Sequence, residues 1–183
     1  MTGGVRYPRD IKADSYPSNS SKLNAIVLEN HPADSRIKIC EDNIFQTLHA
    51  RMGTGGNNVP MVLQNGIVRR ISPLECERLQ LFPDNWTDIG EWTDSKGKKH
   101  KSSDSQRYKA LGNSIALPFW DWLAERICAQ YDHPIAMASL FDGISGFCLC
   151  FARHGATPVW ASEIEEFCIA VAKVRFPEEA SND

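Results

Sequence analysis

The sequence lacks any long apolar run and any feature of a secreted chain. No stretch of about 18 consecutive apolar residues occurs, so no membrane-spanning helix is expected. The first ten residues, MTGGVRYPRD, lack the apolar centre of a signal peptide. These absences predict a cytoplasmic protein with no membrane partner.

Closely spaced cysteine pairs and a strong excess of one charge are missing too. None of the six cysteines forms a Cys-x-x-Cys pair, which favours reduced, mostly buried thiols over a metal site or disulfides. A net charge of -3 argues against a small basic DNA-coating protein, although a local basic patch can still bind phosphate. With 42% hydrophobic residues in 183, the chain has the composition of one globular domain or two small ones.

Three segments differ in character. Residues 1–23 are rich in Ser, Pro, Asp and Lys and are interpreted as a flexible leader. Residues 24–132 begin β-rich, with strands expected at 25–30 and 44–50 and a hairpin at 59–71 closed on Asn65-Gly66. Between them, RMGTGGNN has enough glycine for the backbone to approach another surface closely.

Helices are expected next. Ser72, Pro73 and Glu75 form a capping box with proline at the first helical position, and Pro83 is expected to end that helix. A second helix is expected within 108–127, after a lysine-rich stretch. Its core face is predicted from helical spacing to carry Ala116, Phe119, Trp120, Leu123 and Ile127. Asn113 and Ser114 precede this face, where they either cap the helix or contact a ligand.

Residues 133–183 have a β-α-β-α pattern, which is typical of the start of a parallel sheet. A buried strand (134–141) leads through the turn DGISG to a helix, whose apolar stripe is expected at Phe147, Cys150, Phe151 and His154. A second strand (157–162) ends at Glu163, 20 residues beyond Gly143, which is the spacing of an acid that binds ribose hydroxyls. The glycine fingerprint is partial, because Ser145 stands where glycine would let a ligand approach more closely.

Several blocks together resemble the DNA (cytosine-5) methyltransferase family. SLFDGISGF is similar to the family's first motif and VWASEIEEFC to its second, while VRRISPLECERLQLFPDNW resembles the ninth and RYKALGNSIALP the tenth. FQTLHARMGTGG resembles the end of the target-recognition region. The resemblance implies an α/β fold that holds the start of a Rossmann-like sheet binding S-adenosylmethionine. Residues 24–132 would then be the recognition part with the ninth and tenth motifs.

The order of these blocks differs from the usual one, because the first motif follows the tenth. The resemblance therefore implies a circular permutation joined within CAQYDHPIAM, which is feasible where chain ends lie close in space. The third to eighth motifs are expected to be absent, which suggests a truncated form or one half of a split enzyme.

The family's nucleophile is a cysteine that follows proline, and no cysteine here does. No catalytic residue is therefore assigned. Two alternatives stay open, namely a non-catalytic subunit that binds DNA and cofactor beside a second chain, and a nicotinamide-dependent oxidoreductase.

The resemblance implies roles for two sets of residues. Those expected at S-adenosylmethionine are Phe141, Gly143, Ile144, Gly146, Glu163, Ile164, Asn113 and Ser114. Those expected at double-stranded DNA are Thr47, Arg51, Gly53, Gly55 and Gly56. Arg69 and Arg78 are expected to brace the recognition part, and the lysines at 96–101 either contact phosphate or form a solvated loop. Because only the first strands of a sheet are present, self-association is also expected.

Overall fold

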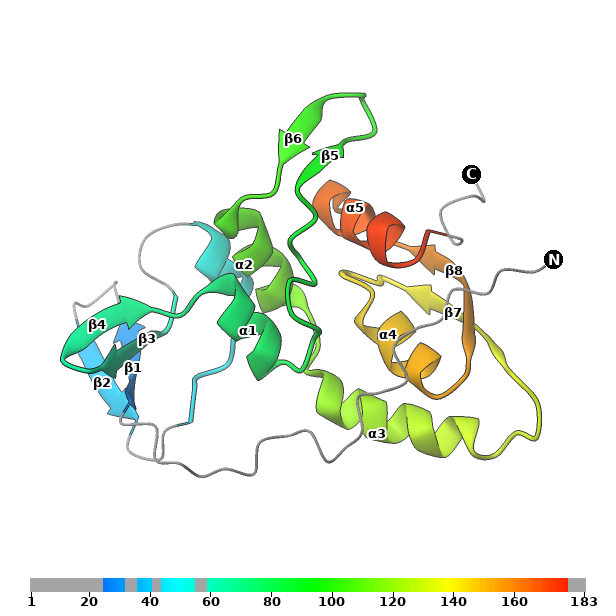
Figure 1. The fold of residues 1–183 in the computed structure, drawn as a ribbon, viewed down its shortest axis with the longest axis horizontal. Helices are drawn as coiled ribbons and strands as arrows, with labels where there is room; N and C mark the ends of the chain where they lie inside the picture. The colour runs from blue at the N-terminus through cyan, green and yellow to red at the C-terminus, as the bar shows by residue number, and fades with distance from the viewer. Residues whose placement is uncertain (1–24, 32–35, 41–43, 55–58, 178–183) are drawn as a thin grey trace.

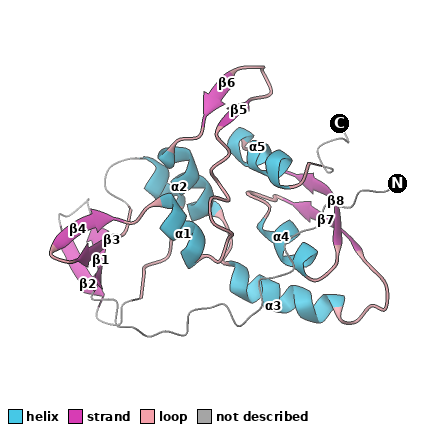
Figure 2. Ribbon diagram, viewed as in Figure 1, coloured by secondary structure: helices cyan, strands magenta, loops and turns pink. Residues whose placement is uncertain are grey.

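A computed structural model describes residues 25–31, 36–40, 44–54 and 59–177. An antiparallel sheet lies at one end, two helices lie in the middle, and a parallel strand pair with its helices lies at the other end (Figure 1). The colouring by secondary structure in Figure 2 shows the helical middle between the two sheet regions. The expected leader, residues 1–23, lies outside the described residues.

The first sheet has the strand order β2-β1-β3-β4, and all its neighbours are antiparallel. Its strands are β1 (Ala25–His31), β2 (Arg36–Cys40), β3 (Met61–Gln64) and β4 (Ile67–Arg70). The hairpin predicted on Asn65-Gly66 is confirmed. Both turn residues have positive φ, 52° and 77°, which a two-residue hairpin turn requires and which Asn and Gly tolerate.

The prediction of a strand at 44–50 is wrong. Residues 44–49 have no regular structure, and the 3-10 helix η2 (Ala50–Thr54) follows. Tertiary contact overrides the apolar pattern here, because η2 packs against helix α2. A Cβ on Gly112 of α2 would lie 2.1 Å from the backbone carbon of His49, so glycine permits this close approach.

Helix α1 (Pro73–Leu79) begins at the predicted capping box. The Ser72 hydroxyl accepts a bond from the Glu75 backbone N–H, and the Glu75 carboxylate accepts one from the Ser72 N–H at 2.7 Å. The helix ends at Leu79, before Pro83, and Leu81 takes a left-handed φ of 63°. After it come strands β5 (Glu91–Thr93) and β6 (Lys99–Lys101), which form an antiparallel hairpin.

The expected helix within 108–127 is two helices, α2 (Asp104–Asn113) and α3 (Leu117–Cys128). The predicted core face is confirmed only in part. Phe119 is 60% exposed and Ala116 is also exposed, whereas Trp120 packs against the core and Leu123 and Ile127 are half-buried. The fully buried residues of α3 are Leu117 and Ala124. Asn113 and Ser114 end α2 and do not cap α3, whose N-cap residue, Ala116, makes no side-chain cap bond.

The predicted β-α-β-α pattern is confirmed. Its elements are β7 (Ala136–Leu140), α4 (Gly146–Arg153), β8 (Thr157–Ser162) and α5 (Glu166–Arg175), and β7 pairs with β8 in parallel. The prediction that β7 is a buried strand is wrong, since Ser139 is the one buried residue in it. The stripe expected on α4 is confirmed in part, because Cys150 is buried and Phe151 packs against the core, but Cys148 and Leu149 outside that stripe are buried as well.

The whole is a mixed α/β structure whose core runs from η2 and α1 through α2 and α3 to α4 and α5. Four cysteines are buried and all six are free thiols, as the sequence predicted. No helix among the described residues is long and apolar enough to cross a membrane.

Candidate functional site: the turn after β7 and its neighbours

The turn between β7 and α4 has an unusual backbone. Phe141, Gly143 and Ser145 all have positive φ, at 56°, 61° and 62°. Such a conformation costs a non-glycine residue about 1–2 kcal/mol, so two residues are strained here. The turn is fixed at two points, because the Asp142 N–H donates to the Ser162 carbonyl at 2.9 Å and the Trp86 indole N–H donates to the Ile144 carbonyl at 2.7 Å.

Glu163 follows β8 and joins that strand's end to the turn. Its carboxylate accepts backbone N–H bonds from Gly143 at 2.7 Å, Ile164 at 2.6 Å and Glu165 at 2.9 Å. Burial alone would raise the pKa of this carboxyl, but the three N–H donors outweigh burial and hold the pKa below its usual value. Glu163 is therefore a fixed carboxylate at neutral pH.

The start of α3 packs directly against the start of α4. A Cβ on Gly146 would lie 3.1 Å from the Ile115 side chain and 3.2 Å from that of Leu117, so glycine allows this contact. The Cys150 thiol approaches the Leu117 carbonyl at 3.8 Å, and Arg153 pairs with Asp121 of α3 at 3.3 Å. Residues that resemble the tenth motif thus lie beside those that resemble the first.

Helix α2 contacts the segment that follows the carboxyl end of β8. Lys109 forms an ion pair with Glu165 at 2.8 Å, two residues after Glu163. Buried Gln80 fixes the connection from α2 to α3, because its side-chain amide donates to the Leu111 carbonyl and its own carbonyl accepts from the Leu117 N–H. The link carrying Asn113 and Ser114 is therefore held between the two halves of the structure.

The residues expected at a cofactor lie in different environments. Phe141 and Ile164 are 83% and 84% exposed, at the carboxyl ends of the two parallel strands. A Cβ on Gly143 would meet no atom within 4 Å, so the space beside it is open. Ile144 is buried and packs in the core instead. Asn113 is exposed and Ser114 is half-buried.

Two polar residues in the turn have surroundings that the sequence does not reveal, since it marks Ser145 only as a departure from the glycine pattern and suggests no role for Asp142. Asp142 and Ser145 are both buried, and one carboxylate oxygen of Asp142 and the Ser145 hydroxyl lack hydrogen-bond partners. The other Asp142 oxygen accepts a bond from the Cys148 thiol at 3.4 Å. Trp86 was missed as well, because its partner Ile144 lies 58 positions away and no local pattern joins them.

Three of the residues expected at DNA, Thr47, Arg51 and Gly53, lie on or just before η2. Thr47 and Arg51 are exposed. Gly53 has a packing role, since a Cβ there would lie 2.4 Å from the Ser105 carbonyl oxygen of α2. Gly55 and Gly56 lie outside the described residues.

The arginines near α1 are occupied within the protein. Arg69 forms a two-bond pair with Glu75, and Arg78 one with Asp84, as bracing requires. The Arg69 bonds, working against burial, lower the pKa of Glu75 to about 2.

A buried polar network also joins α1 to α2. The Glu77 carboxylate accepts bonds from the Arg107 guanidinium at 3.2 Å and from the Thr87 backbone N–H at 2.8 Å. Glu77 and Thr87 are fully buried, so this network fixes how the two helices meet.

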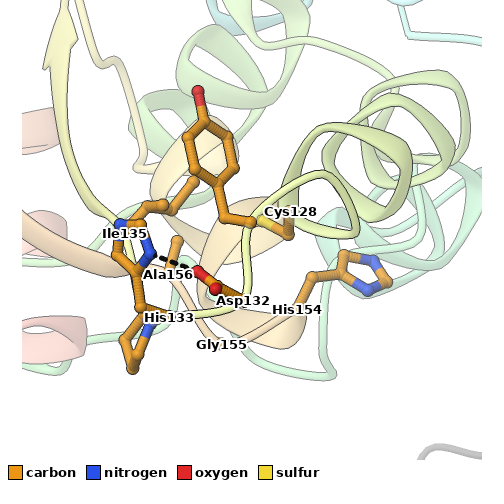
Figure 3. Close-up of a pocket in the computed structure, with 9 residues that line it drawn as sticks. Cys128, Asp132, His133, Ile135, His154, Gly155 and Ala156 are labelled. Atoms are coloured by element: carbon orange, nitrogen blue, oxygen red, sulfur yellow. Dashed lines mark hydrogen bonds and ion pairs between the residues drawn. The ribbon is translucent and has the colours of Figure 1, made fainter.

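A cavity of about 280 Å³ lies away from the turn, at the amino ends of β7 and β8. Figure 3 shows the residues that line it. The His133 ring is hydrogen-bonded to the Asp132 carboxylate, and the side chains of Cys128 and His154 are part of the same lining. No group of three or more possible metal ligands occurs among the residues that the structure describes.

Comparison with known proteins finds DNA methyltransferases. The chain is 32% identical over 87 residues to the type II methyltransferase M.Bsp6I of Bacillus sp. (strain RFL6), 48% of this chain and 24% of that protein. It is 35% identical over 81 residues to the type II methyltransferase M1.ScrFI of Lactococcus lactis subsp. cremoris, and the match covers 44% of this chain and 18% of that protein. A protein of Escherichia phage P1 named DNA N-6-adenine-methyltransferase is 39% identical over 82 residues, and the match covers 33% of this chain and 10% of that protein. The chain thus spans about a quarter or less of each relative's length.

A family model covers a larger share of the chain. The model for C-5 cytosine-specific DNA methylase matches residues 7–129, which run through the first sheet, α1, the β5–β6 hairpin, α2 and α3. The match covers more than half of the 183 residues and ends before β7. The chain belongs to the C-5 cytosine-specific DNA methylase family.

Proposed function

We propose that the chain is part of an S-adenosylmethionine-dependent DNA (cytosine-5) methyltransferase, with the cofactor bound at the carboxyl ends of β7 and β8. The observation that carries the proposal is the packing of α3 against α4 at Gly146, which sets residues of the family-matched part beside the β7 turn. In this proposal β7-α4-β8-α5 is the start of a Rossmann-like sheet.

The open edge of the parallel pair suits this cofactor. Phe141 and Ile164 offer exposed apolar surface, and the space beside Gly143 is free. The Glu163 oxygen that faces Gly143 accepts one hydrogen bond, from the Gly143 N–H, and has capacity for another, from a ribose hydroxyl. Asn113 and Ser114 would close the site from the α2–α3 link, and Gly146 permits the close packing beneath it.

When bound, S-adenosylmethionine supplies an electrophilic methyl group. The residues of this chain would bind and orient it, while attack on C6 of a flipped cytosine requires a thiolate. Burial raises the pKa of the Cys76, Cys150 and Cys168 thiols to about 12, so these stay protonated at neutral pH. The proposal is therefore that the nucleophile, with the rest of the third to eighth motifs, comes from another segment or a second chain.

The motif order supports a circular permutation as part of this proposal. The family match ends at residue 129, and residues 129–135 lead directly into β7. Since α3 lies against α4, a short link of this kind joins two neighbours without disturbing their packing. The second candidate function is a non-catalytic subunit that binds DNA and cofactor. It is favoured because no cysteine in this sequence follows a proline, as the family's nucleophile does. A cytoplasmic location, as the sequence predicts, is part of the same proposal.

Two measurements test the proposal. Calorimetry should show that the chain binds S-adenosylmethionine in preference to NAD, whereas preference for NAD would contradict the cofactor assignment. In a transfer assay with methyl-labelled cofactor and duplex DNA, the chain alone should leave the DNA unlabelled. Added protein that supplies the Pro-Cys segment should give 5-methylcytosine on nucleoside analysis. N6-methyladenine instead, or labelling by the chain alone, would overturn the chemistry proposed.

A further inference from the structure

The β5–β6 hairpin carries a concentration of positive charge that the family comparison does not explain. Within residues 91–101, four lysines stand against Glu91 and Asp94, giving this short segment a net charge of +2 in a chain of net charge -3. These lysines are Lys96, Lys98, Lys99 and Lys101, and all four are exposed. The hairpin projects beyond the helices at the top of Figure 1.

The hairpin is held firmly on its other face. Trp92 is buried, stacks on His100 with ring centres 4.6 Å apart and meets Phe167 of α5 edge-on at 5.8 Å. The Ser95 backbone N–H donates to the Glu166 carboxylate at 3.0 Å. The hairpin is therefore a preorganised part of the surface, anchored to α5.

Strand alternation turns the lysines away from this anchor. Lys99 and Lys101 flank His100 in β6, so their side chains point to the face opposite the Trp92 contact. Lys96 and Lys98 flank the tight turn at Gly97, whose φ is 77°.

The two acids of the hairpin compensate only part of this charge. Asp94 is occupied by its own turn, since it accepts N–H bonds from Lys96 and Lys98 and pairs with His100 at 2.8 Å. Glu91 faces Lys101 in the strand register. Within the described part of the chain, none of the four lysine ammonium groups forms an ion pair.

The anchor lies beside the proposed cofactor edge. Glu166 and Phe167, which hold the hairpin, follow Glu163 by three and four residues. A duplex whose base is to reach that edge must pass close to its rim. Rigidly mounted, unpaired lysines at such a rim are what a phosphate backbone attracts, because each contact releases condensed counterions.

We propose that the β5–β6 hairpin is a DNA-backbone contact, with its lysines on the phosphates of the duplex beside the target site. This inference rests on the proposed function, since it takes double-stranded DNA as the substrate. The contact carries no base specificity, and it holds the duplex against the cofactor edge.

The test is the salt dependence of binding of the full chain to a fluorescein-labelled DNA duplex, followed by anisotropy. The main variant changes all four hairpin lysines to glutamine. A matched pair of single variants compares Lys99→Gln with Lys173→Gln, an exposed lysine in the last turn of α5, outside the hairpin. Circular dichroism and tryptophan fluorescence check that each variant stays folded.

We expect the plot of log affinity against log salt to lose about 0.9 of slope for each phosphate contact removed, hence roughly 2 to 4 for the fourfold variant. At about 100 mM salt its affinity should fall at least tenfold. Lys99→Gln should reduce the slope measurably, and Lys173→Gln should not.

The other outcomes separate the two claims. If the wild type binds DNA and the fourfold variant binds equally well, the hairpin inference is wrong and the proposed function stands. An equal loss in Lys99→Gln and Lys173→Gln would show diffuse attraction and overturn the hairpin inference. Tighter binding of duplex RNA than of DNA would also overturn it. Failure of the wild type to bind DNA at all would overturn both.

Discussion

Changing Glu163 to alanine should weaken folding and cofactor binding together. The carboxylate accepts three backbone N–H bonds, from Gly143, Ile164 and Glu165, and alanine leaves all three donors without this partner. A hydrogen bond to a charged group contributes about 1.5–3 kcal/mol when shielded. Because Glu163 is half-buried and water can replace part of each bond, we expect a total loss of about 1–3 kcal/mol in unfolding free energy.

The pH dependence of this loss has a defined sign. The folded-state pKa of Glu163 lies below its usual value of 4.5, so its contribution is fully present above pH 4.5. That contribution disappears as the pH falls through the lower folded-state pKa. The difference in unfolding free energy between wild type and Glu163→Ala should therefore shrink on acidification.

Cofactor binding gives the second readout. Losing the ribose hydrogen bond to this carboxylate should weaken S-adenosylhomocysteine binding at least about tenfold, or 1.4 kcal/mol. Glu163→Gln keeps one acceptor oxygen and should lose less. Glu165→Gln is the control, because it removes a charge from the same segment but only a half-exposed pair with Lys109. Calorimetry at pH 7 that shows unchanged affinity for Glu163→Ala would refute the reasoning.

Three further outcomes are expected. Gly112→Ala would place a Cβ 2.1 Å from the His49 backbone and should cost at least about 3 kcal/mol in a thermal melt, whereas Gly97→Ala meets nothing and should cost about 1 from its positive φ. Equal losses would contradict this packing. Glu75, paired with Arg69 and with a pKa near 2, should contribute about 1 kcal/mol or less above pH 4.5, lost towards pH 2, since both side chains are over a third exposed. Glu75→Gln should remove that dependence in urea titrations. The exposed edge of β7 and β8 should cause self-association, and a clean monomer by light scattering at high concentration would contradict it.

Local chemistry made part of the fold predictable. The Asn65-Gly66 turn and the Ser72 capping box each depend on residues within a few positions, so the sequence indicates them directly. The parallel strand pair followed from the same kind of local pattern, together with the acid at Glu163.

Long-range packing was not predictable in the same way. The apolar residues at 44–50 imitate a strand, but the approach of η2 to Gly112 decides their conformation. Spacing alone placed Phe119 in the core, whereas contact with Gly146 turns Leu117 inward instead. Each of these outcomes depends on partners dozens of residues away, which periodicity cannot reveal.

Within the candidate site, the residue types were suggested by resemblance and their surroundings came from the structure. Glu163 was expected to hold a ribose, but its bond to the Gly143 N–H became visible only when strand and turn were placed together. The buried Asp142 and the Trp86 bond to the turn have no local sequence signal.

The most direct test of the central claim is an experimental structure of the chain with S-adenosylhomocysteine. We expect the ligand at the carboxyl ends of β7 and β8, with a ribose hydroxyl within hydrogen-bond distance of Glu163 and the adenine against Ile164. Ligand found instead in the cavity at the amino ends of these strands, or no ligand at saturating concentration, would contradict it.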